Sequence, residues 1–293
     1  MAKLQQQNNL NKTAFLAAAT TAALILFSFF GAPFVRVLSA SVKSITFWFV
    51  GTVFVALLFV FNFSIASVYV GAVWMTLGLY SEFEKRGINW KPTSLLAILA
   101  GFFFTIISLV VKSNGRIEDS SAVKDLLQPM QVALKNIMTE EEFYKLNIIQ
   151  YLPGIFLATL VTSLAISFIF ESRIFELFRL QQEKIASSVK WIEFRTPDLF
   201  IWISLFSYFF SLINFEISHL KIISINISIF TATVFFFQGI AVMEYLNRFY
   251  RVGRFTKMAV YLLVFGWMGP GVCLVGLLDY WVDFRKKVRK KIK

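Results

Sequence analysis

Two aspartates and an arginine near the C-terminus form the strongest candidate for polar chemistry in this 293-residue sequence. Asp279 and Asp283 are four residues apart, so on a helix they share one face and repel each other unless a cation lies between them. Arg285 follows them, and Arg195 lies much earlier in an aromatic and basic turn, WIEFRTP. One interpretation is a site for an ion or a substrate headgroup. The other, which we favour, is a pair of salt bridges, for instance to Arg195 or Arg251, because interfacial carboxylates beside basic loops usually pair.

Gln238 and Gly239 lie inside an apolar stretch. Gln238 supplies a side-chain amide, and Gly239 supplies a position where another backbone can approach closely. The amide can bind the polar groups of a ligand, or it can hydrogen-bond a neighbouring helix for a gain of about 0.6–2 kcal/mol. We favour the helix–helix hydrogen bond. Glu244, six residues later, is expected near the end of the same span, where it reaches the interface or pairs with Arg248 at i+4.

Residues for metal binding or catalysis are scarce. The sequence has one histidine, His219, and one cysteine, Cys273, which excludes an intrachain disulfide and leaves no second imidazole or thiolate for a zinc site. It has no phosphate-cradling glycine loop and no evident base beside a buried nucleophile. We therefore expect no enzymatic activity, no metal and no cofactor.

Composition assigns the chain to a membrane. Hydrophobic residues make up 57% of the sequence and charged residues 16%, whereas about a quarter of the residues of a soluble domain are charged. Several apolar runs reach the roughly 20 residues that a helix needs to cross about 30 Å of hydrocarbon. These runs are apolar on every side, unlike the alternating strands of a membrane barrel. The sequence thus predicts an all-α, polytopic transmembrane bundle.

We expect about eight spans, seven or eight, in one membrane domain (13–283), preceded by a polar segment (1–12) and followed by a basic tail (284–293). The run 45–80 is about twice as long as one crossing needs, so that a turn near Asn62 and Ser64 would divide it into two helices. The alternative is one crossing plus a re-entrant piece. The other spans are expected at 13–34, 94–111, 148–170, 199–215, 222–245 and 258–278. Pro33 is expected at the end of the first of these, before a basic turn with Arg36, and Pro153 is expected to kink the span 148–170.

Two polar segments, about 112–147 and 171–198, carry apolar residues at helical spacing and are expected to be amphipathic at the membrane surface. The net charge of +12 lies in the loops and the tail, where it orients spans and attracts anionic lipids without any need for nucleic acid. If every span crosses, the positive charges divide almost evenly between the two sides. If the Gly-Pro-interrupted run 258–278 enters and returns on one side, they concentrate on the side of the tail. Both topologies place the tail in the cytoplasm, and the choice stays open.

Four stretches of the sequence resemble the YybS-like family of predicted bacterial membrane proteins. They are FFQGIAV (236–242), GLLDYWVDFRKK (276–287), the WIEFRTP turn, and IIQYLPGIF after the longest hydrophilic segment. The resemblance covers about residues 94–287 and implies a protein of a bacterial inner membrane, without an established biochemical activity. In organisation, the chain is also distantly similar to the substrate-binding S components of energy-coupling factor transporters.

Ala14, Ala18 and Ala22 recur every four residues on the first expected span, where small side chains let another helix approach closely. S components carry small residues at this spacing on their first helix, where the coupling subunit docks, so the similarity implies a helix-docking face here. The alternative is packing within the chain's own bundle, which we favour because small residues at this spacing are common in membrane helices.

Two functions follow as hypotheses. The first is a substrate-binding or transport-associated component. Its pocket would be lined by the C-terminal spans, and a partner such as a membrane coupling subunit would supply the energy. The second is a non-transporting scaffold that organises partner proteins or lipids through its amphipathic segments and basic tail. A ligand inside the bundle would favour the first function, and a solidly packed bundle would favour the second.

Overall fold

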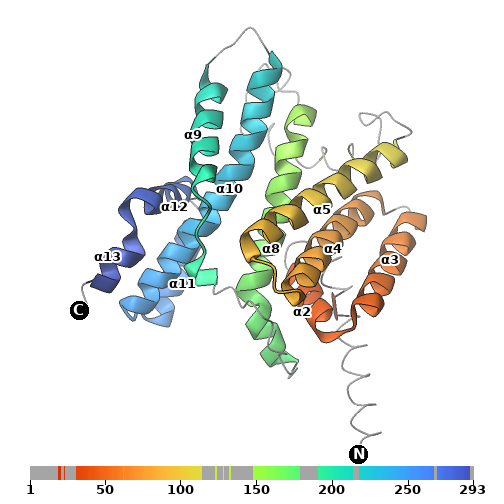
Figure 1. Cartoon of the computed structure of the whole chain (residues 1–293), viewed down its shortest axis with the longest axis horizontal. Coiled ribbons are helices and arrows are strands. Elements are labelled where there is room, and N and C mark those ends of the chain that lie inside the picture. Colours follow the sequence, from red (N-terminus) through yellow and green to blue (C-terminus); the bar gives the residue numbers. More distant parts are fainter. Residues whose placement is uncertain are drawn as a thin grey trace, which may run out of the picture. The chain divides into compact units, whose positions relative to one another are not determined.

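The computed structural model describes most of the apolar part of the chain. The described residues are 31–61, 63–113, 148–178, 191–213, 218–266 and 269–290, with the isolated positions Ala19, Thr20, Ala23, Val123, Gln128 and Val132. All regular elements in these ranges are helices (Figure 1), which confirms the prediction of an all-α membrane-type bundle. The alanine face (Ala14, Ala18, Ala22) and nearly all of the segment 112–147 lie outside the described residues.

The chain forms two compact units, Met1–Ser187 and Ser188–Lys293, here called unit 1 and unit 2. Two compact units can still make up one membrane domain, so the expected domain 13–283 stays a prediction.

The described part of unit 1 contains four long helices and two short ones. They are α2 (Ala32–Ser41), α3 (Ser44–Val60), α4 (Ser64–Lys85), α5 (Trp90–Lys112), the 3₁₀ turn η3 (Ile148–Tyr151) and α8 (Leu152–Leu177). Helix α4 packs against α2, α3 and α5, and α8 packs against α2 and α5. Gly101 brings α5 close to α4, because a Cβ there would lie only 2.9 Å from the Ala72 carbonyl oxygen. The end of α3 at Val60 and the start of α4 at Ser64 confirm the expected division of the run 45–80 into two helices.

Two prolines in unit 1 begin helices, and this corrects two expectations. Pro33 stands in the first turn of α2, so Arg36 lies in a helix and not in a basic turn. Pro153 stands in the first turn of α8, where it starts the helix and does not kink it. The physical reason is the same for both. Proline lacks the N–H that the first turn leaves unpaired, and its fixed φ suits a helix start.

Unit 2 is organised around one long helix, α10 (Ser218–Phe249), against which α9 and α12 pack (Figure 1). The other elements are the 3₁₀ turn η4 (Trp191–Glu193), α9 (Leu199–Leu212), α11 (Arg254–Gly266), α12 (Gly269–Val282) and α13 (Phe284–Lys290). The run 258–278, expected as a last span interrupted by glycines and a proline, forms α11 and α12, and whether it crosses or re-enters stays a prediction. Pro270 lies at the second position of α12, and in the middle of a continuous helix it would remove a hydrogen bond and clash with the preceding turn.

The structure describes only the two ends of the expected amphipathic segment 171–198, so its amphipathic character stays a prediction. Residues up to Leu177 continue α8, residues 179–190 lie outside the described ranges, and Trp191–Glu193 forms η4.

Three described helices are long and apolar enough to cross a membrane: Trp90–Lys112, Ile148–Leu177 and His219–Phe249. They coincide with three of the expected spans. Three shorter apolar helices, Ser44–Val60, Leu199–Leu212 and Gly269–Val282, accompany them. Large apolar side chains are exposed on α5 and α9, among them Phe103 and Phe209, as is typical of surfaces that face lipid.

Candidate functional site

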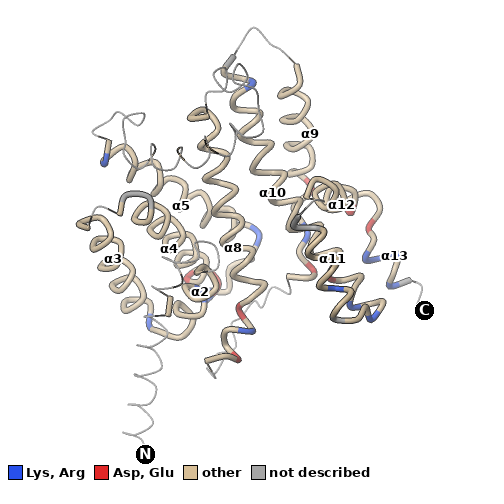
Figure 2. The backbone as a smooth tube through the Cα atoms, turned by 180° about the vertical axis from the view of Figure 1, so that it is seen from behind, with Lys and Arg blue, Asp and Glu red and all other residues tan. Residues whose placement is uncertain are grey.

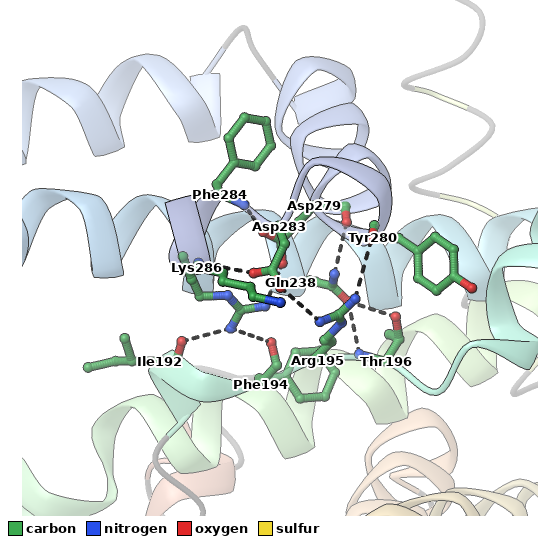
Figure 3. A network of polar contacts seen from close by, with 12 residues as sticks. Ile192, Phe194, Arg195, Thr196, Gln238, Asp279, Tyr280, Asp283, Phe284 and Lys286 are labelled. Atoms are coloured by element: carbon green, nitrogen blue, oxygen red, sulfur yellow. Dashed lines mark hydrogen bonds and ion pairs between the residues drawn. The ribbon is translucent and has the colours of Figure 1, made fainter. Parts of the chain in front are cut away.

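Gln238, near the middle of α10, is 1% exposed and joins three segments of unit 2. Its Oε1 accepts hydrogen bonds from the backbone N–H of Thr196, at 2.9 Å, and from the Thr196 hydroxyl, at 2.7 Å. Its Nε2 donates to the carbonyl oxygen of Gly276 on α12, at 2.9 Å (Figure 3). The amide therefore makes the helix–helix contact that we favoured from the sequence, and it also holds the WIEFRTP turn.

Two glycines bring α10 and α12 close enough for this contact. A Cβ on Gly239 would overlap the Val272 carbonyl oxygen and lie 2.8 Å from Val272 Cγ1. A Cβ on Gly276 would overlap the Phe235 carbonyl oxygen and lie 2.8 Å from the Gly239 nitrogen. Only a hydrogen fits at either position, so the two backbones touch and the amide of Gln238 reaches across.

Asp279, in the last turn of α12, forms the buried ion pair of the site. Its side chain is 1% exposed, and its Oδ2 lies 2.6 Å from Nη2 of Arg285. Its Oδ1 accepts a hydrogen bond from the backbone N–H of Phe284, at 3.1 Å. The Nη1 of Arg285 donates to the carbonyl oxygens of Ile192, at 3.0 Å, and Phe194, at 2.9 Å. This pair thus ties the end of α12 and the start of α13 to the turn that begins with η4.

Asp283 forms a second and more exposed pair with Arg195, at 3.5 Å between Oδ2 and Nη1. The side chains are 30% and 40% exposed. Arg195 also donates from Nη2 to the Tyr280 carbonyl oxygen, at 3.3 Å. Asp283 has a positive φ of 43° and separates α12 from α13, where its Oδ1 accepts from the Lys286 N–H at 3.1 Å. Each aspartate therefore has its own arginine, which relieves the repulsion expected between them.

The six residues proposed from the sequence as a ligand or packing site therefore gather in one place. We call Arg195, Thr196, Gln238, Asp279, Asp283 and Arg285, with the glycine contact of Gly239 and Gly276, the C-terminal network (Figure 3). Its carboxylates, guanidinium groups and amide bond one another and the backbone. A ligand that used these groups would have to displace bonds already made within the chain, so the arrangement fixes α10, α12 and α13 around the WIEFRTP turn.

Sequence reasoning missed part of a second polar cluster, around Glu244 on α10. Glu244 is 4% exposed, and its Oε1 accepts from Nε of Arg248, at 3.0 Å, which is the i+4 pair considered from the sequence. The Nζ of Lys257 and the hydroxyl of Tyr261, both on α11, also lie 2.6 Å from its carboxylate oxygens. Lys257 and Tyr261 are four residues apart, and this shared helix face was the signal that could have revealed them.

A third polar cluster, in unit 1, was not predicted. Arg36 of α2 is 2% exposed and pairs with Glu84 of α4. Its Nη1 donates to the Ser81 hydroxyl, at 2.9 Å, and its Nε lies 3.5 Å from Oε1 of Glu171 on α8. Burial by itself lowers the pKa of Arg36, but the nearby carboxylates of Glu171 and Glu84 more than offset it, so the pKa is raised and the guanidinium stays charged.

The described residues contain no group of three histidine, cysteine, aspartate or glutamate side chains that could hold a metal ion. His219 is exposed in the first turn of α10. Cys273 is a free cysteine on α12.

Residues 13–280 match the family described as "Predicted membrane protein (DUF2232)". The chain belongs to this family. No curated protein and no solved structure matches it. Membership of the DUF2232 family agrees with the membrane assignment, and the description of the family names no activity.

Replacing Gln238 with leucine should lower the free energy of unfolding of this DUF2232 protein by about 1–3 kcal/mol. The buried Thr196 N–H and hydroxyl would then lose their bonds to Oε1, and the Gly276 carbonyl oxygen would lose its bond from Nε2. Chemical unfolding in detergent, followed by tryptophan fluorescence, measures the loss. Thr233→Val is the matched control, because that hydroxyl bonds only the Ile229 carbonyl of its own helix, and it should cost about 0.5 kcal/mol or less. Equal effects of the two substitutions would contradict the bridging role of Gln238.

Proposed function

We propose that this DUF2232 protein is a multi-pass protein of a bacterial inner membrane that organises partner proteins or lipids and does not itself transport a substrate. The observation that carries the proposal is the C-terminal network, whose polar groups are bonded within the chain. Substrate sites need convergent polar groups with bonding capacity to spare. Here Gln238, Asp279 and Arg285 use that capacity to hold helices together.

The distribution of charge supports a cytoplasmic, lipid-contacting end of unit 2. Exposed basic side chains lie at the α10–α11 turn (Arg248, Arg251) and on α13 (Lys286, Lys287, Arg289). Figure 2 shows the basic residues of both elements toward the same end of unit 2. Such residues favour the cytoplasmic side, and each contributes about 1 kcal/mol of attraction near anionic lipids. This arrangement fits the topology in which the last apolar run enters and returns on one side.

A second candidate, a substrate-binding component energised by a partner, is favoured by one observation. The last apolar run is divided between two helices, α11, which ends at Gly266, and α12, which begins at Gly269. Interrupted helices at membrane depth line the substrate sites of many transporters. In this function, the face of Ala14, Ala18 and Ala22 would receive the coupling subunit.

A purification of the tagged full chain in mild detergent separates the two functions. Mass spectrometry would identify the proteins, lipids and small molecules that co-purify with the wild type, with Ala18→Leu and with the charge-reversed variant K286E/K287E/R289E. The scaffold proposal expects membrane proteins that Ala18→Leu retains, and anionic phospholipids that the charge-reversed variant loses.

The result that would overturn the scaffold proposal is equally specific. It is an ATPase pair with a membrane coupling subunit, lost on Ala18→Leu, or a stoichiometric small molecule bound to the wild type. Either outcome would establish the substrate-binding function instead.

A further inference from the structure

Three of the buried polar atoms in unit 1 that make no hydrogen bond belong to one cluster. They are Nε of Arg36, Oε1 of Glu171 and the hydroxyl of Tyr80. Tyr80 is 0% exposed, and its ring lies 5.0 Å from the guanidinium carbon of Arg36. Its hydroxyl is close enough to interact electrostatically with Arg36, Glu84 and Glu171. Nε of Arg36 and Oε1 of Glu171 face each other at 3.5 Å as an ion pair without a hydrogen bond, and the Tyr80 hydroxyl has no partner, so the cluster lacks hydrogen bonds that buried polar groups usually make.

The charges of the cluster do not balance. One guanidinium, that of Arg36, faces two carboxylates, those of Glu84 on α4 and Glu171 on α8. Their side chains are 2%, 4% and 15% exposed. A buried carboxylate without a counter-charge is strongly unfavourable, so this group of three holds one negative charge too many.

The other charged side chains of the packed helices do not supply the missing cation. Lys85 of α4 donates to the Ser39 carbonyl oxygen, at 2.9 Å, and lies 3.8 Å from Glu82, at an exposed edge. Arg173 and Glu176 of α8 are exposed and carry opposite charges.

We propose that α2, α4 and α8 enclose a binding site for one proton, held by Glu84 because its carboxylate and that of Glu171 face the single guanidinium of Arg36. A proton removes the excess negative charge and needs no additional volume. A metal ion would need several oxygen ligands, and no metal-binding group is present among the described residues. Water would supply hydrogen bonds but no charge. The proposal is independent of the scaffold function.

The same proton balances the charge and adds a hydrogen-bond donor to the cluster. It passes from water to a carboxylate oxygen, and the resulting carboxylic acid has an O–H donor that neither carboxylate has when ionised. Glu171 favours this proton through its charge, because its carboxylate competes with that of Glu84 for the one guanidinium. Loss of the proton leaves a negative charge buried between three helices, so the packing of α8 against α2 and α4 becomes sensitive to pH.

The test is the pH dependence of unfolding of the full chain in detergent, compared with Glu171→Gln. Unfolded glutamates release their protons above about pH 4.3, whereas the folded cluster retains one. Above that pH the folded state therefore binds more protons than the unfolded state, and stability falls as pH rises until the site empties. Over this window, one proton changes the unfolding equilibrium about tenfold per pH unit.

Glu171→Gln places a neutral amide at the site, so its stability should lack this tenfold dependence and should exceed that of the wild type at high pH. Glu176→Gln, an exposed change on the same helix, should keep the wild-type slope. The double variant E84Q/E171Q should be the least stable, because Arg36 would then be the unpaired charge. Identical slopes for the wild type and Glu171→Gln would overturn the proposal.

A second measurement applies if Glu171→Gln does not fold. Infrared spectroscopy of the wild-type protein at neutral pH should show the C=O stretch of a protonated carboxylic acid. A spectrum with carboxylates alone would refute the site.

Discussion

Replacing Gly276 with alanine is expected to lower the free energy of unfolding by about 3 kcal/mol, although it adds a single methyl group. The new Cβ would overlap the Phe235 carbonyl oxygen of α10 and lie 2.8 Å from the Gly239 nitrogen. Both are backbone atoms of a helix, so no side-chain rotation relieves the clash and α12 must move away from α10. Overpacking of this kind typically costs about 1–3 kcal/mol. The shift would also weaken the bond from Gln238 to the Gly276 carbonyl oxygen, so we expect the upper end of that range.

Gly271→Ala provides the control in the same helix. A Cβ at Gly271 would have no atom within 4 Å, and alanine is the better helix former by up to about 1 kcal/mol. We therefore expect opposite signs for the two substitutions, measured by chemical unfolding in the same detergent. If Gly276→Ala proves as stable as Gly271→Ala, the close contact between α10 and α12 is wrong.

Local signals allowed much of the fold to be predicted from the sequence. The division of the run 45–80 followed from its length and from Asn62 and Ser64, which interrupt an otherwise apolar stretch. The sequence also indicated most residues of the C-terminal network. Asp279, Asp283 and Arg285 lie within seven residues of one another, and membrane segments rarely hold such residues without pairing them.

The prolines show where local signals were insufficient. A proline within an apolar run ends a helix, kinks one or begins one, and the choice depends on which neighbouring N–H groups already have partners. Pro33 and Pro153 both begin helices. Arg36 therefore lies inside α2, and α8 has no kink at Pro153.

The arginine cluster of unit 1 was beyond sequence reasoning for a different reason. Arg36 and its partners Glu84 and Glu171 come from three helices, separated by dozens of residues, and no periodicity connects them. In the sequence, each lies just beyond the end of an apolar run. Only the packing of α2 against α4 and α8 shows that two carboxylates share one guanidinium.

Replacing Asp279 with asparagine is expected to lower the free energy of unfolding by about 3–5 kcal/mol. Asparagine keeps the shape of the side chain and an oxygen that can accept from the Phe284 N–H. It removes the charge that compensates Arg285, whose side chain is 7% exposed. Breaking one side of a buried ion pair leaves the other charge uncompensated, and that is the source of the loss.

Asp283→Asn tests the same chemistry four residues later and should cost less than about 1 kcal/mol. The pair of Asp283 with Arg195 is 3.5 Å long and partly exposed, so water solvates both groups once the pair is broken. Asparagine also tolerates the positive φ at this position. The double variant D279N/R285M should lose less than the sum of its single changes, because it removes both buried charges.

Equal losses for the two aspartates would mean that Asp279 is solvated. The C-terminal network would then keep polar capacity for a ligand, and the substrate-binding function would become the better explanation of this site.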